Sequence, residues 1–211
     1  NAAGELFVLA PQAIGVELES LVPQGLVEVQ AVAPGYQIMS SPDNCGYPDY
    51  ALATWDPAPT CNYSTSVTNK DTVVIHVAEG SAAATISWFK NCSSGVAAHY
   101  VMDEAGAIWQ MVCERHVGYH IVCYNNRSIG IEHEGYISNP DWYTNAMYNA
   151  SAAITRQSCA RYGGIVCTRA MKSYTSADLS DASYDIIGHQ NLTDNSHTDP
   201  GKYWNWSKYY G

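Results

Sequence analysis

The sequence has few charged side chains for its length, and few of them are basic. Asp, Glu, Lys and Arg make up 14% of the 211 residues, against roughly 25% in an average soluble domain. Lys and Arg number 10, Asp and Glu number 20, and the formal net charge is −10 at pH 7 with neutral histidine. No basic stripe is present to neutralise phosphates, which argues against nucleic acid or anionic lipid as a partner.

Long apolar runs are also absent. None approaches the ~20 residues that a membrane-spanning helix needs, and internal repeats and low-complexity segments are missing too. The chain starts at Asn1 without a methionine or a recognisable signal peptide, as we expect of a processed mature form. Its length predicts one domain with a full core and an appendage.

The seven cysteines include no Cys-x-x-Cys pair, which argues against a cysteine-based zinc site. Closeness in the sequence predicts three local disulfides. These are Cys45–Cys61, Cys113–Cys123 and Cys159–Cys167. Cys92 would then be a free, buried thiol. Because disulfides persist in oxidising compartments, the pairing predicts a secreted, extracellular protein.

Residues 1–69 predict an N-terminal β/loop arm and a disulfide-pinned lead-in segment. The alternating runs Val16–Glu19 and Leu26–Val32 predict strands with one apolar face. Residues 34–63 are rich in Pro, Gly, Asp and Asn, which is typical of an ordered loop. Since two isolated strands are marginal in water, the arm needs a covering surface. This is either the chain's own domain or a second copy, joined by strand addition in a self-associated form.

Residues 70–211 predict a mixed α/β unit. The expected strands and helices are set by β-branched runs, by turn signals and by helical periodicity. Strands are expected at 72–77, at 98–102 and 107–112 as a hairpin, and at 128–134; helices are expected at 82–90 and 141–162. Ser81 is a predicted N-cap for the first helix, and Gly163-Gly164 is expected to end the second.

Histidines and aspartates gather in one C-terminal segment, IIGHQNLTDNSHTDPG. These side chains carry the donors that zinc takes, and a catalytic zinc keeps three protein ligands and one open position. His189 with either His197 or Asp199 would need a third ligand from a distant, rigid element. The β-branched run Thr72–Val77 offers His76 near its C-terminal edge.

Four motifs occur in order along the chain: VVIHVAEG, AAHYVMDEAG, SIGIEHEG and GHQNLTDNSHTDPG. Together, over residues 70–206, they resemble the zinc-dependent N-acetylmuramoyl-L-alanine amidase family, which includes peptidoglycan recognition proteins and phage lysozyme-type amidases. The resemblance implies a mixed central β-sheet flanked by helices and one zinc ion per chain. It also implies peptidoglycan as substrate, cut at the amide between N-acetylmuramic acid and the L-alanine of the stem peptide.

The resemblance further implies residue roles. His76, His189 and Asp199 would be the zinc ligands, and Glu132 of SIGIEHEG the general base. Zinc lowers the pKa of a coordinated water toward ~7, so a nearby carboxylate can take the proton as water attacks an amide carbon. Glu134 lies two residues on, hence on the same face of a regular strand, and is the rival base.

Other positions match the family less closely. His197 stands where many relatives have lysine, whose cation would stabilise an oxyanion; histidine could fill that catalytic role in a pH-dependent way. Tyr119 and His120 stand where relatives often show Trp-His, and His99 lies in a matching strand motif. These three are candidate substrate contacts, with His99 more suited to the core or the site wall. His133 is expected on the opposite strand face, with a structural role.

Two alternatives from other classes remain. The chain would be a non-catalytic peptidoglycan-binding module if the cleft were kept without turnover, but the intact metal and base candidates argue against this. It would be an extracellular structural or assembly protein if an amidase-derived domain served attachment, and the long N-terminal arm is the only support for that. Metal-dependent digestion of cell wall would distinguish the amidase interpretation from both alternatives.

Overall fold

The computed structural model describes residues 45–169, 173–180 and 185–210. They belong to one compact unit, Cys45–Gly211, so the expected boundary between residues 69 and 70 does not coincide with the edge of this unit. The predicted strands Val16–Glu19 and Leu26–Val32 lie outside the described residues. Among the helices of the described part, none is long and apolar enough to cross a membrane.

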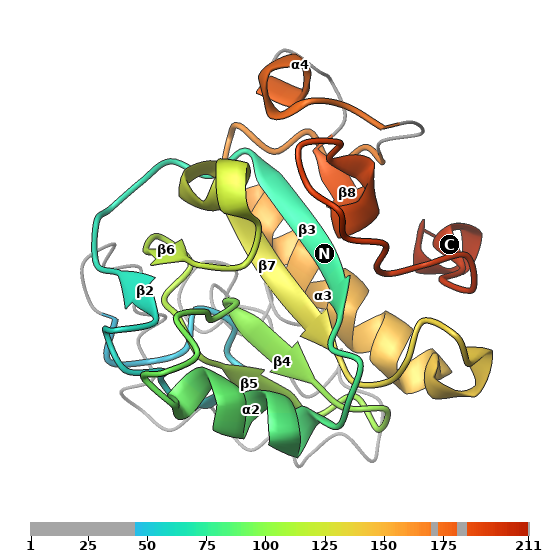
Figure 1. Ribbon diagram of the computed structural model, residues 1–211, viewed down its shortest axis with the longest axis horizontal. Coiled ribbons are helices and arrows are strands. Elements are labelled where there is room, and N and C mark those ends of the chain that lie inside the picture. The colour runs from blue at the N-terminus through green and yellow to red at the C-terminus, as the bar shows by residue number, and fades with distance from the viewer. Residues whose placement is uncertain (1–44, 170–172, 181–184, 211) are drawn as a thin grey trace, which may run out of the picture. The chain divides into compact units, whose positions relative to one another are not determined.

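A six-stranded mixed sheet forms the centre of the unit, in the order β1-β5-β4-β7-β3-β8 (Figure 1). The strands are β1 (Thr54–Trp55), β3 (Thr72–Val77), β4 (Tyr100–Met102), β5 (Ile108–Gln110), β7 (Ser128–His133) and β8 (Ile186–Gly188). Strand β3 is parallel to both neighbours, β7 and β8, and β7 is parallel to β4. Strands β4 and β5 are antiparallel, which confirms the predicted hairpin.

The lead-in segment is part of this architecture. Strand β1 adds to the sheet edge parallel to β5. Strands β2 (Tyr63–Ser64) and β6 (Val117–Gly118) form a separate antiparallel pair. The mixed sheet flanked by helices is therefore confirmed, and it includes residues before position 70.

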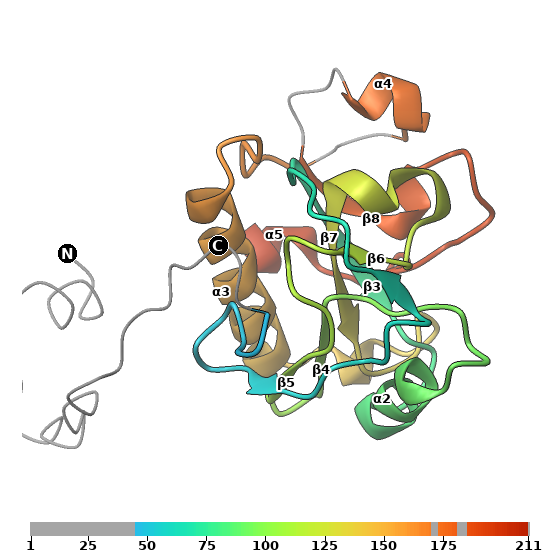
Figure 2. The same ribbon diagram turned by 90° about the vertical axis from the view of Figure 1, so that its left-hand side faces the viewer.

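Helices cover both faces of the sheet. The helices of the described part are α2 (Ala82–Lys90), α3 (Asn145–Arg161), α4 (Ser176–Ser180) and α5 (Trp206–Tyr210), with 3-10 turns η2 (Val122–Arg127), η3 (Pro140–Trp142) and η4 (His189–Asn191). Figures 1 and 2 show α3 on one side of the sheet and α2 on the other. The Ser81 hydroxyl accepts from the Ala84 N–H at 3.2 Å, which confirms the predicted N-cap.

Helix α3 begins later than its sequence pattern indicated. Thr144 caps it by accepting from the Met147 N–H at 3.1 Å, so the residues just before it form η3 instead of a first helical turn. Small apolar residues do not by themselves form its buried face, because Ala146 and Ala160 are exposed. The larger apolar side chains turn inward instead, and burying them removes more apolar surface from water.

Side-chain alternation along the strands separates the core from the site. The odd-numbered apolar residues of β3 and β7 pack with α3 in one cluster of buried side chains, as in the case of Ile75 and Ile131. Because successive strand residues point to opposite faces, His76 and Glu132 project from the face away from α3. His133 returns to the α3 face, where its Nε2 lies 2.8 Å from the Ser151 hydroxyl.

Two of the three predicted disulfides are wrong. The bonds are Cys45–Cys113, Cys61–Cys92 and Cys159–Cys167, and only the last was expected. Cys123, not Cys92, is the free thiol, and it is exposed. Sequence distance misled because the fold brings distant segments together: the buried Asn62 amide donates to the Phe89 carbonyl at 2.7 Å, which holds the end of α2 beside Cys61.

Candidate active site

The first two site residues are neighbours across the sheet. His76 on β3 and Glu132 on β7 are direct partners in the parallel register. Paired residues of parallel strands point to the same face, so an imidazole and a carboxylate stand side by side. The β-branched run predicted to carry a histidine to its C-terminal edge does so.

A second element supplies the remaining candidates. His189 follows directly after β8, and the Gln190 N–H donates to the Asp199 carbonyl at 2.8 Å, which brings the end of the 189–199 loop back to its start. Close packing here depends on glycine: a Cβ on Gly188 would lie 2.4 Å from the Pro200 Cδ. The loop therefore places the Asp199 carboxylate next to the β3 histidine.

The three candidate metal ligands meet at this point. The His76 Nδ1 lies 3.1 Å from Asp199 Oδ2, and the His189 Nδ1 lies 3.3 Å from Asp199 Oδ1. One potential ligand atom from each of the three lies within 4.8 Å of the others. All three residues are buried, with exposed fractions of 2%, 3% and 8%.

The donor set fits a zinc ion. Two imidazoles and one carboxylate are the borderline nitrogen and oxygen donors that zinc takes in catalytic sites. The His189 Nε2 and the Glu132 Oε2 are buried and have no hydrogen-bond partner in the described part of the protein. A buried polar atom without a partner costs about 1–3 kcal/mol, so both atoms favour a bound ion or water beside the cluster.

Burial and hydrogen bonding together set the charges of His76 and Asp199. Burial lowers the pKa of His76 to about 4, although its hydrogen bond to Asp199 opposes the change. Burial alone would raise the pKa of Asp199, but hydrogen bonds with His189 and His76 outweigh it and hold that pKa well below its usual range. Neutral imidazole and ionised carboxylate are the forms that bind a metal.

Burial, and then the Asp199 charge, raise the pKa of Glu132 well above its ordinary value. A carboxyl group whose pKa is raised in a cavity is a candidate for proton transfer. Glu134 lies elsewhere: it does not line the cavity, and its Oε2 accepts from the Glu104 N–H at 3.2 Å. Of the two glutamates, the structure brings only Glu132 to the metal-ligand candidates.

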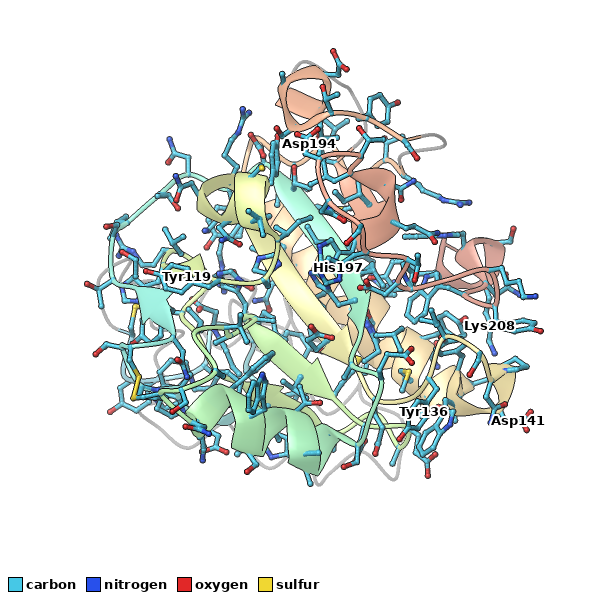
Figure 3. All side chains as sticks on the ribbon, in the orientation of Figure 1. Tyr119, Tyr136, Asp141, Asp194, His197 and Lys208 are labelled. Carbon is cyan, nitrogen blue, oxygen red and sulfur yellow. A yellow bond between two sulfur atoms is a disulfide. The ribbon has the colours of Figure 1, made fainter. Side chains whose placement is uncertain are left out.

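A cavity of about 750 Å³ opens over this cluster. Its wall includes the three ligand candidates and Glu132, and also Tyr119, His120 and His197. In Figure 3 the labelled His197 lies over β3 and Tyr119 lies near β6. Apolar side chains from several elements complete the wall; these are Val77, Phe89, Val96, Ile121, Val122 and Ile137.

His197 stands at the mouth of the cavity. Its ring stacks on His189 with centroids 3.9 Å apart and planes 14° apart. Its Nδ1 lies 3.6 Å from Asp199 Oδ1, and 57% of its side chain is exposed. The imidazole is therefore beside the cluster and accessible to a molecule entering the cavity.

The three candidate substrate contacts are not equivalent. Tyr119 and His120 line the cavity, whereas His99 does not. His99 is fully buried: its Nδ1 accepts from the Gly130 N–H at 3.0 Å and its Nε2 donates to the His116 carbonyl at 3.1 Å. Both ring nitrogens are thus bonded to backbone groups. This arrangement favours a core role for His99 over contact with the substrate.

Sequence reasoning missed several residues that shape the site. Ser128 was recognised only as the start of a strand, yet its hydroxyl lies 3.2 Å from the His120 Nε2. Asn125 Oδ1 accepts from the backbone N–H groups of His120 and Ile121. Glu79 lines the cavity and accepts from the Ile137 N–H at 2.7 Å. For Ser128, its place as the first residue of the SIGIEHEG motif was the one available signal.

Comparison with known proteins agrees with this geometry. Residues 66–202 match the N-acetylmuramoyl-L-alanine amidase family. The curated N-acetylmuramoyl-L-alanine amidase A of Achromobacter lyticus is 42% identical over 166 residues, which cover 77% of this chain and 93% of that protein.

Two solved structures share the fold. A selenomethionine derivative of AmpD superposes with a TM-score of 0.59 at 24% identity, over 76% of this chain and 94% of that one. The amidase LysC of Clostridium intestinale URNW gives 0.56 at 18% identity, over 74% and 93%. The family match covers most of the described unit, and the alignment with the Achromobacter lyticus amidase covers 93% of that protein. This chain therefore belongs to the N-acetylmuramoyl-L-alanine amidase family.

Proposed function

We propose that this protein is a secreted, zinc-dependent peptidoglycan hydrolase that cleaves the amide between N-acetylmuramic acid and the L-alanine of the stem peptide. The observation that carries the proposal is the meeting of His76, His189 and Asp199 with Glu132 in one cavity. The name of the 42% identical relative supports the same bond as the target. The three disulfides support an oxidising, extracellular setting.

The metal site would consist of His76, His189 and Asp199. When bound, zinc would supply a Lewis acid that polarises a carbonyl and lowers the pKa of water. The chain's own groups hold this site in place: the His133 Nδ1 lies 2.7 Å from the His76 carbonyl and supports the end of β3.

Glu132 is the proposed general base. Its Oε2 has no hydrogen-bond partner among the described residues and could take a proton from the attacking water, which it would then give to the leaving alanine nitrogen. His197 is the proposed donor to the oxyanion of the tetrahedral intermediate, because it is exposed at the cavity mouth beside the cluster. Tyr119 is the candidate for contact with the substrate.

The chemistry of the products tests this function. Purified protein is incubated with peptidoglycan, and the soluble products are analysed by mass spectrometry and by labelling of new amino groups. We expect free L-alanine amino termini on released stem peptides and no new reducing sugar ends. New reducing ends without new amino termini would show a glycosidase, and binding without any product would show a recognition module. Self-association through the N-terminal arm stays a prediction.

A further inference from the structure

A line of hydrogen-bonding groups leads away from the metal-ligand candidates into the protein. While the Nδ1 of His76 faces Asp199, its Nε2 lies 3.0 Å from the Nδ1 of His120. The Nε2 of His120 lies 3.2 Å from the Ser128 hydroxyl, which donates to the Tyr124 carbonyl at 2.9 Å. Every ring nitrogen in this line therefore has a partner.

The end of the line fixes its direction. The Tyr124 carbonyl can only accept, so the single hydroxyl proton of Ser128 is used there. The Ser128 oxygen must then accept from a proton on His120 Nε2. A neutral imidazole carries one proton, so the Nδ1 of His120 has a free lone pair. That lone pair is placed to accept from a proton on the His76 Nε2, the tautomer that leaves the His76 Nδ1 open to a metal.

This direction matters for the ligand atom. With its proton on Nε2, His76 presents a lone pair at Nδ1, on the side of Asp199. Without a metal, the carboxylate opposite Nδ1 favours a proton there, so binding an ion requires the proton of His76 to be carried on Nε2. His120 provides the acceptor for it. Metal-binding histidines commonly donate their other ring N–H to such a partner, which fixes the tautomer and the ring orientation.

Space and backbone contacts hold His120 in position. A Cβ on Gly130 would lie 2.6 Å from the Nδ1 of His120, so only glycine at this position on β7 leaves room for the ring. The backbone N–H of His120 donates to Asn125 Oδ1 at 2.9 Å. Although His120 lines the cavity, its nitrogens face His76 and Ser128 and are not free for a substrate.

We propose that His120, oriented by Ser128, is a positioning residue that selects the metal-binding tautomer of His76 and thereby sets the zinc affinity of this chain. The inference rests on the metal site of the proposed function, and it replaces substrate contact as the role of His120. It concerns how the site is prepared for the ion and not the chemistry of the amide.

Zinc affinity is the measurement that tests the proposal. Dissociation constants are determined by competition with a chromophoric chelator at pH 7.5 for the wild type, His120→Leu, His120→Gln and Ser128→Ala. Loss of such a supporting partner typically weakens metal binding by roughly 10–100-fold. We expect this for His120→Leu, a smaller loss for Ser128→Ala, and partial rescue in His120→Gln, because its amide can both accept from His76 and donate to Ser128.

Two further variants test whether zinc affinity depends on the position of the His120 ring and not only on its presence. Gly130→Ala leaves every group of the line present but displaces the His120 ring, and we expect it to weaken zinc binding as well. His116→Gln is the matched control, since it removes a histidine that neither lines the cavity nor belongs to the line; its zinc affinity should equal that of the wild type. Circular dichroism of each variant confirms that the fold is retained.

A measurement on the wild-type protein tests the inference even if some variants do not fold. In zinc-loaded wild type, long-range proton–nitrogen NMR spectra should show His120 neutral with its proton on Nε2. A proton on Nδ1, or a doubly protonated ring, would overturn the inference, as would wild-type affinity in His120→Leu. If the wild-type protein binds no zinc at all, the metal site of the proposed function is wrong. If the wild type binds zinc and the His120 and Ser128 variants bind it equally tightly, this inference alone fails.

Discussion

Glu132 lies opposite His76 in the parallel register of β7 and β3, and both side chains project from the sheet face away from α3. This relationship places a carboxylate directly beside a metal-ligand candidate, and one of its oxygens is buried without a hydrogen-bond partner in the part of the chain that the structure describes. The adjacency is set by strand pairing and not by a loop. A one-residue slip of register would turn every side chain of a strand to the other face, so the pairing itself secures the site.

The two glutamates of the SIGIEHEG motif should therefore differ in function. Glu132→Gln should lower the turnover rate by roughly 10²–10⁴-fold, as loss of a general base does, while zinc content stays unchanged. Glu134→Gln is the matched control, since Glu134 lies outside the cavity wall and accepts from the Glu104 N–H. Steady-state rates on a soluble muropeptide measure both, and an inactive Glu134→Gln with an active Glu132→Gln would reverse the assignment.

His197 should affect the rate more than the binding of substrate. His197→Ala removes a donor at the cavity mouth, and loss of an oxyanion donor costs up to roughly 10²–10³-fold in kcat. Zinc content should remain that of the wild type, because Asp199 keeps its contacts with His76 and His189. His197→Lys should keep more activity than His197→Ala. Equal kcat for His197→Ala and wild type would remove His197 from the mechanism.

Stability should depend on pH through Lys70, which is 2% exposed and donates to the His116 carbonyl. Burial lowers the pKa of Lys70 to about 7 from its ordinary 10.5, although Glu114 and Asp71 oppose the change. Between these two pH values the unfolded chain binds the proton and the folded chain does not, so the free energy of unfolding contributed by Lys70 rises with pH.

The slope of this effect is at most about 1.4 kcal/mol per pH unit. Urea unfolding of wild type and Lys70→Met at pH 6, 7, 8 and 9 isolates it, since methionine is uncharged throughout. The free energy of unfolding of wild type, relative to Lys70→Met, should increase from pH 7 to 9 and stay level below pH 7. A difference that is constant across this range would contradict the prediction.

The disulfide between Cys61 and Cys92 should contribute measurably to stability. It closes a loop across a sequence separation of 31, and disulfides typically contribute about 2–4 kcal/mol. The double variant Cys61→Ser with Cys92→Ser should lose that amount in urea unfolding. Cys123→Ser is the control and should lose little, because this thiol is exposed and unbonded. Peptide mapping without reduction should find Cys61 linked to Cys92, and a Cys113–Cys123 peptide would refute the pairing.

The sequence predicts the strands of the sheet core and the way its metal-ligand candidates are supplied. β-branched runs locate β3 and β7, and the period of two along each strand separates His76 from Ile75 and Glu132 from Ile131. The hairpin at β4 and β5 follows from its turn residues. These features depend on residues close together in the sequence, so a single sequence is enough to predict them.

Features that depend on distant packing were not predictable. Cys61 and Cys92 meet because Asn62 binds the end of α2, and no local pattern encodes that approach. The role of His120 depends on the space above Gly130 and on the Ser128 hydroxyl. Sequence position suggested a substrate contact, whereas the packed structure turns both of its nitrogens toward other side chains.

The most direct test of the account is zinc dependence of amide hydrolysis in wild type and in His76→Ala. Protein is stripped with a chelator, zinc is titrated back, and released L-alanine amino termini are measured against bound zinc. We predict that wild-type hydrolysis disappears on stripping and returns in proportion to zinc up to one ion per chain, whereas His76→Ala neither retains zinc nor recovers activity. Full hydrolysis by stripped wild type, or full zinc occupancy in His76→Ala, would contradict the account.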